Sequence, residues 1–216
     1  MRLSFGYVVI AAGVCGILSF AFLATSLGTD YWYIIEMNQV NTSDLEDLSS
    51  HSGLWSINEG GKTDSIDSFN TDYTKFSDAE LHMLNMHSAI VVLLPLSLVL
   101  VLVGGICGLV SSLARSPILL TGTAFYFFIC SLLTLSGVSL YIVYSHQALV
   151  ETERLVGLEA LSYIRTSFGW SLALAWLSYS LELLTGLLLL AAARMSKHRH
   201  SSPSLACHRT QDSYVI

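Results

Sequence analysis

Charge is scarce in this sequence. Only 12% of the 216 residues are Asp, Glu, Lys or Arg, whereas 53% are hydrophobic. Globular domains carry roughly 25% charged residues, so this chain has too little polar surface to cover a body that faces water. The composition therefore excludes a soluble globular domain and a disordered chain, and it predicts a membrane protein.

Positive charge is the scarcer sign: there are 10 Lys and Arg residues against 16 Asp and Glu residues, for a net charge of −6. A nucleic-acid partner is excluded because no basic stripe exists to neutralise phosphates. The chain also lacks a nucleophile with a base and an orienting partner, and it lacks histidine or cysteine spacings that suit a metal. We therefore expect no enzyme, no cofactor and no metal site.

Long stretches without charge are abundant instead. A hydrocarbon core about 30 Å thick is crossed by roughly 20 helical residues, and only helices or closed barrels satisfy the backbone in lipid. The chain is therefore predicted to be an all-α membrane protein, a four-helix transmembrane bundle with spans near residues 6–28, 88–110, 118–143 and 168–193.

The connections between these spans are unequal. Residues 29–87 and 144–167 are long, whereas residues 111–117 form a short turn. The positive-inside rule favours cytoplasmic termini and a cytoplasmic short turn, because this arrangement places inside Arg2, Arg115, Arg194, Lys197, Arg199 and Arg209 against Asp212. We expect a plasma-membrane protein with one tetraspan domain, residues 1–193, and a disordered cytoplasmic tail, residues 194–216.

The first span has an alternative interpretation as a cleaved signal peptide. Arg2 provides a charged start and Ala24-Thr25-Ser26 a small-residue cleavage site. The apolar stretch is about twice as long as a signal core, which favours a retained helix.

The first outer loop contains strand and modification signals. The run from Asp30 to Glu36 is aromatic and β-branched, and a second short strand fits residues 53–57. These runs predict a small antiparallel extracellular sheet built from the first outer loop. Asn41 begins the sequon Asn41-Thr42-Ser43, which we expect to carry an N-linked glycan if this loop faces the lumen.

Trp32 followed by Gly53-Leu54-Trp55 resembles the W…GLW signature of the claudin, peripheral-myelin-protein and calcium-channel γ-subunit superfamily. The runs Leu94–Leu98 and Ser167–Ser171 are similar to segments of claudin-like members. The resemblance covers all four spans. It implies a claudin-like tetraspan bundle that works through protein partners.

One departure concerns cysteine. The family signature continues with two cysteines, the first of them three residues after the GLW tryptophan, and Asn58 stands there instead. The chain has four cysteines, and none lies between Cys15 and Cys107. No disulfide can form within the first outer loop. Its sheet must therefore be stabilised by aromatic packing or be less stable than the sheet of relatives.

That loop is also acidic, with 11 carboxylates and two lysines between Asp30 and Glu80. Two interpretations remain open. The acids attract cations at a pore, as the resemblance to cation-selective claudins implies, or they only solvate the loop.

Glu182 lies halfway along the fourth span, where a charge costs at least about 2.5 kcal/mol. We expect it to face other helices as interhelical glue or as a subunit-docking switch. The candidate partners are Ser131, Thr134, Ser136, Ser139 and Tyr179. The pairs Ala12/Gly16 and Gly104/Gly108 favour close helix packing, within one chain or in a homodimer.

The chain ends in Tyr214, Val215 and Ile216, and a free carboxylate after an apolar residue fits strand addition to a PDZ groove. We expect contact with membrane lipid and consider self-association, a PDZ scaffold and a channel or receptor as protein partners. Two functions follow. The first is a non-enzymatic organiser of cell-contact or lateral assemblies, and the second is an auxiliary γ-like subunit of a channel or receptor.

Overall fold

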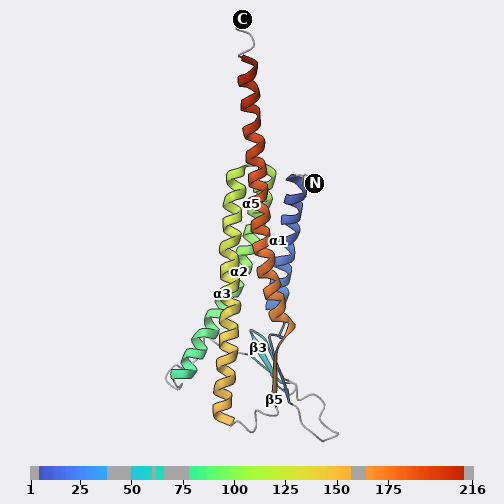
Figure 1. Cartoon of the computed structure of the whole chain (residues 1–216). Coiled ribbons are helices and arrows are strands. Elements are labelled where there is room, and N and C mark those ends of the chain that lie inside the picture. Colours follow the sequence, from blue (N-terminus) through green and yellow to red (C-terminus); the bar gives the residue numbers. More distant parts are fainter. Residues whose placement is uncertain (1–4, 38–49, 60–61, 66–77, 157–163, 212–216) are drawn as a thin grey trace. The chain divides into compact units, whose positions relative to one another are not determined.

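The computed structural model describes residues 5–37, 50–59, 62–65, 78–156 and 164–211. Within these ranges it contains four long helices and one sheet (Figure 1). The helices are α1 (Phe5–Leu27), α2 (Asp78–Ala114), α3 (Pro117–Val156) and α5 (Trp170–Gln211). Each contains a stretch long and apolar enough to cross a membrane, namely Phe5–Leu27, Leu81–Ala114, Pro117–Val150 and Trp170–Lys197. The prediction of four apolar helices is confirmed.

A tight turn separates α2 from α3. Arg115 takes a left-handed conformation, with φ of 49°, at the position where glycine commonly ends a helix. The amide of Leu120 donates to the carbonyl of Ser116 at 3.1 Å. Pro117 is the first residue of α3, a position that suits proline because an N–H there would have no partner within the helix. The chain thus passes from α2 to α3 through two residues, Arg115 and Ser116.

Contacts divide the chain into two compact units, and each contains part of all four helices. The first unit comprises residues 1–20, 99–131 and 180–216. Gly104 allows α2 to approach α3, because a Cβ there would lie 2.9 Å from the Tyr126 ring. The core of this unit consists of Val8, Ala12, Val101, Leu120, Ala124, Phe127, Cys130, Leu189, Ala192 and Ala193.

The second unit comprises residues 21–98 and 132–179 and contains the sheet. The strands are β1 (Tyr33–Met37), β2 (Ser50–Ser52), β3 (Ser56–Glu59), β4 (Lys62–Ser65) and β5 (Ile164–Phe168), in the order β4-β3-β2-β1-β5. All neighbours are antiparallel. The core of this unit consists of Leu23, Leu27, Trp32, Leu54, Ile90, Val91, Leu94, Val138, Tyr141, Leu172 and Ala175.

The sheet differs from the expectation in two respects. We expected strands from the loop between α1 and α2 alone, whereas β5 comes from the loop between α3 and α5 and pairs with β1 from Tyr33↔Phe168 to Met37↔Ile164. The strand expected over residues 53–57 begins only at Ser56. The connection from β2 to β3 consists instead of Gly53, Leu54 and Trp55. In this connection the Gly53 amide and the Trp55 indole donate hydrogen bonds and Leu54 is buried.

The end of α5 also differs from the expectation. The helix continues to Gln211, whereas we expected disorder from residue 194. The residues from Arg194 to Lys197 include Arg, Met and Lys, which propagate a helix readily, and neither Gly nor Pro lies between Arg194 and Pro203. These residues account for the helix as far as Pro203, which the helix itself contains.

Candidate functional site

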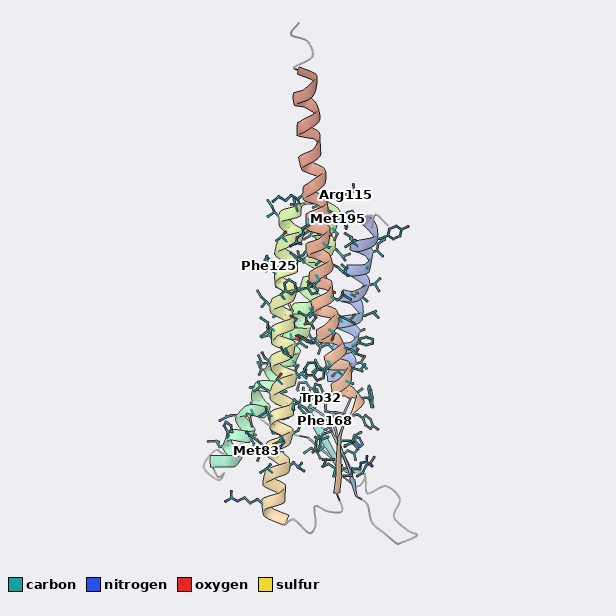
Figure 2. The ribbon with its side chains drawn as sticks, viewed as in Figure 1. Trp32, Met83, Arg115, Phe125, Phe168 and Met195 are labelled. Atoms are coloured by element: carbon teal, nitrogen blue, oxygen red, sulfur yellow. The ribbon has the colours of Figure 1, made fainter. Side chains whose placement is uncertain are left out.

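Trp32 anchors the sheet at the end of α1 (Figure 2). Its side chain is fully buried, and its indole Nε1–H donates to the carbonyl of Ser26 at 2.8 Å. The ring packs against Tyr141 of α3 with centroids 4.7 Å apart. The last carbonyls of a helix have no partner within the helix, so the indole supplies the shorter of the two hydrogen bonds to the Ser26 carbonyl, and the Thr29 hydroxyl donates the other at 3.3 Å.

Trp55 donates a hydrogen bond to the next carbonyl in the last turn of α1. Its indole Nε1–H donates to the carbonyl of Leu27 at 2.9 Å, although 46% of the side chain remains exposed. Trp is suited to both positions, because one side chain combines a large apolar surface with a single N–H donor. The two tryptophans of the signature therefore cap the end of α1.

Gly53 and Leu54 explain the rest of the GLW motif. A Cβ at Gly53 would lie 2.7 Å from the Cα of Asp30, so no larger residue fits without moving the backbone. The amide of Gly53 donates to the carbonyl of Ser56 at 2.8 Å, which closes the connection between β2 and β3. Leu54 is fully buried in the core of the second unit.

The segment before α5 completes the site. The amides of Gly169 and Ser171 donate to the carbonyls of Trp32 and Tyr31 at 3.0 and 3.2 Å. A Cβ at Gly169 would collide with the Tyr31 carbonyl. Ser26 returns a hydrogen bond from its hydroxyl to the Ser171 carbonyl at 2.7 Å.

Sequence reasoning found the tryptophan signature but missed these partners. Residues 30–36 were predicted as a strand and residues 167–171 stood out as family-like sequence, but nothing in either run indicated that one contacts the other. Ser26 and Tyr141 gave no signal at all, because a serine near a helix end and a tyrosine in an apolar span are common.

The sheet is held without a disulfide in the part of the chain that the structure describes, where Cys15, Cys107 and Cys130 are free thiols. Asn58, at the family's cysteine position, is paired in register with His51 and Thr63. Aromatic contacts occur throughout this region: Tyr31 stacks on His51 at 4.5 Å and on Trp170 at 5.7 Å, and Tyr33 meets Phe168 at 5.7 Å.

Glu182 belongs to the first unit and is completely buried. The hydroxyl of Ser19 on α1 donates to its Oε1 at 3.5 Å, which is long for a hydrogen bond. This contact joins α5 to α1.

Three of the four expected α3 hydroxyls make hydrogen bonds with groups on α3 or α2. Ser131 and Ser136 donate to Phe128 and Leu132 carbonyls of α3 at 2.8 and 2.7 Å. In the second unit, Thr134 shares a hydrogen bond of 2.8 Å with Ser97 of α2. Ser19 was missed because the first span contains several small polar residues that are indistinguishable by sequence.

Asn41, Tyr214, Val215 and Ile216 lie outside the described residues. The glycan and the PDZ ligand therefore remain predictions. Within the described ranges, no group of three His, Cys, Asp or Glu side chains is placed to hold a metal ion.

Four membrane-crossing helices and a small sheet that two indoles fix to a helix end define a multi-pass membrane protein of the claudin type. The family model for PMP-22/EMP/MP20/Claudin tight-junction proteins matches residues 17–191. The chain belongs to this family. Membership points to a non-enzymatic structural membrane protein whose apolar helices contact lipid.

Proposed function

We propose that the protein organises cell-contact or lateral membrane assemblies, with its two long loops outside and both termini in the cytoplasm. The observation that carries this proposal is the single sheet formed by both loops and bonded to the end of α1 through Trp32 and Trp55. A surface that is already ordered loses little conformational freedom on binding, which favours association. Such a sheet suits a binding platform.

The platform has features typical of protein interfaces. Phe168 at the end of β5 is 52% exposed, and Tyr31 and Trp170 beside it are also exposed. Aromatic side chains are enriched at interfaces. Because β5 is at one edge of the sheet among the strands that the structure describes, it also suits pairing with a partner strand.

The proposed orientation follows from charge. Arg115, Arg194 and Lys197 are all exposed in the first unit, and the hydroxyl of Ser196 donates to the Arg115 carbonyl at 2.8 Å. Cations concentrated at one end of a bundle mark the cytoplasmic side. Under this orientation a PDZ scaffold would reach Tyr214–Ile216, and Asn41 would meet the glycosylation machinery.

The test is contact formation between cells. Non-adherent cells expressing the fluorescently tagged protein should show enrichment where two expressing cells touch. Phe168→Ala should reduce this enrichment, because it removes the exposed ring beside the sheet. Phe125→Ala is the matched control, since Phe125 is 59% exposed on α3 in the membrane-spanning part of the first unit. Enrichment that is absent in the unmodified protein, or equally reduced by both variants, contradicts the proposal.

The second candidate function is an auxiliary subunit of a channel or receptor. It lacks its nominated contact, because Glu182 is 0% exposed and bonded within its own bundle. Co-purification of a channel that survives Phe168→Ala, without enrichment at contacts, would favour this candidate over the first.

A further inference from the structure

A partly open cavity lies between α1 and α2 in the first unit, with a volume of about 250 Å³. Residues 9–20 of α1 and residues 101–112 of α2 supply most of its lining, with Phe127, Thr185 and Leu189 completing it. We call this cavity the α1–α2 groove. All of its lining falls within the membrane-crossing helices.

The chemistry of the groove is that of hydrocarbon. Its two hydroxyl groups already donate to their own helices, Ser112 to the Gly108 carbonyl at 2.7 Å and Thr185 to the Leu181 carbonyl at 2.8 Å. An apolar cavity of about 150 Å³ stays dry and takes up a small hydrocarbon. The larger groove here therefore suits an apolar occupant and offers little to water.

One end of the groove is positively charged. Ser112 lines the groove, and Arg115 follows it by one turn, with its amide 3.4 Å from the Ser112 carbonyl. Figure 2 shows Arg115 next to Met195, and the hydrogen bond from Ser196 to the Arg115 carbonyl brings the exposed Arg194 and Lys197 to the same end. Residues 5–20, 99–131 and 180–211 contain a single acid, the buried Glu182.

We propose that the α1–α2 groove holds part of one acyl chain of an anionic phospholipid, with the phosphate beside Arg115. This proposal is independent of the assembly function. A helix of a second copy is the competing occupant, but a helix is about 10 Å across with its side chains, and the groove of about 250 Å³ is small for one. A chain with an anionic head matches both the apolar lining and the cationic end.

Two glycines make the proposal testable. Gly13 on α1 and Gly105 on α2 line the groove, and a Cβ at either would meet nothing within 4 Å. The Cβ of a leucine at either position is therefore accommodated, and its remaining carbon atoms are expected to occupy space in the groove. Gly122 on α3 also has nothing within 4 Å but does not line the groove, so Gly122→Leu is the matched control.

The experiment uses the full-length protein in phosphatidylcholine vesicles with a minor fraction of phosphatidylserine. Either lipid carries a photoreactive diazirine in its acyl chain, and labelled peptides are mapped by mass spectrometry. In the unmodified protein, phosphatidylserine should label residues 9–20 and 101–112 several-fold more than the exposed Phe125 face of α3. Uniform labelling of all helices would overturn the proposal without the need for any variant.

The variants test the two halves of the site. Gly13→Leu and Gly105→Leu should each reduce groove labelling several-fold, while Gly122→Leu leaves it unchanged. Arg115→Gly, which suits the positive φ at that position, should equalise labelling by the two lipids. Labelling that persists in both leucine variants, or crosslinks between two protein copies in place of lipid labels, would refute lipid occupancy; an unchanged preference in Arg115→Gly would refute the headgroup assignment.

Discussion

At the residue scale, the family signature is a capping device. Trp32 and Trp55 donate to the carbonyls of Ser26 and Leu27, two consecutive residues at the end of α1. The burial of the two rings differs, since Trp32 is inaccessible and Trp55 is partly exposed. The hydrogen bond from each indole should therefore contribute a different amount to the stability of the fold.

Trp32→Phe keeps most of the ring but leaves the buried Ser26 carbonyl with only the longer hydrogen bond from the Thr29 hydroxyl, at 3.3 Å. Such a loss costs roughly 1–3 kcal/mol, and a protein of this size loses about 2–4 °C of Tm per kcal/mol. We expect a Tm several degrees lower by size-exclusion thermal stability in detergent. Trp55→Phe should have a smaller effect, because solvent can replace its indole; an equal or larger effect would contradict the capping account.

Gly169→Ala tests the close approach of the two loops. The new Cβ would run into the Tyr31 carbonyl, so the pairing of β1 with the segment before α5 must shift, and we expect a loss of several kcal/mol or retention in the endoplasmic reticulum. The control is Gly122→Ala, whose Cβ meets nothing and which should be neutral or slightly stabilising because Ala favours a helix. Surface delivery and Tm are the measurements.

At the element scale, the long helices were predictable and the sheet was only partly so. Hydropathy is a local property, so a span such as Phe5–Leu27 can be recognised from its own residues. Strand pairing is not local. Nothing in residues 164–168 reveals that they pair with residues 33–37, more than a hundred positions earlier in the chain, and the acid–base pair Glu36↔Arg165 becomes visible only once the register is known.

The packing of α5 also combines a feature that the local sequence predicts with one that depends on tertiary contacts. The burial of Glu182 was predictable from its cost in lipid, whereas its contact with Ser19 depends on how α1 is placed beside α5. Which of several serines approaches a carboxyl is decided by tertiary packing, and a sequence pattern contains no such information.

Glu182→Gln distinguishes a role in interhelical hydrogen bonding from a role that requires the ionised carboxylate. The amide preserves the shape and can accept the Ser19 hydrogen bond, so we expect a loss of less than about 1 kcal/mol, in line with interhelical hydrogen bonds that average about 0.6 kcal/mol in membranes. Ser19→Ala should cost a similar amount. A severe loss of folding or assembly in Glu182→Gln, with Ser19→Ala neutral, would show that the ionised carboxylate is required.

At the scale of the whole molecule, both long loops are proposed to lie outside the cell. Asn41 should then carry a glycan, and treatment with an amidase that removes N-linked glycans should shift the protein to lower mass on a gel. Asn41→Gln should migrate at the lower mass without treatment. An unshifted protein, with Asn41→Gln indistinguishable from it, would count against this orientation.

The most direct test of the central claim, that both loops form one sheet on the outer side, is a cysteine crosslink between β1 and β5. Glu36 and Arg165 are exposed partners in register, and directly opposed antiparallel residues have Cα atoms about 4.5–5.5 Å apart, within the range of disulfides. The double variant Glu36→Cys and Arg165→Cys should oxidise spontaneously in cells, so that an impermeant thiol reagent labels it only after reduction. The out-of-register pair Glu36→Cys and Ser167→Cys should be labelled without reduction. Immediate labelling of the in-register pair, or no labelling after reduction on intact cells, would contradict the shared outer sheet.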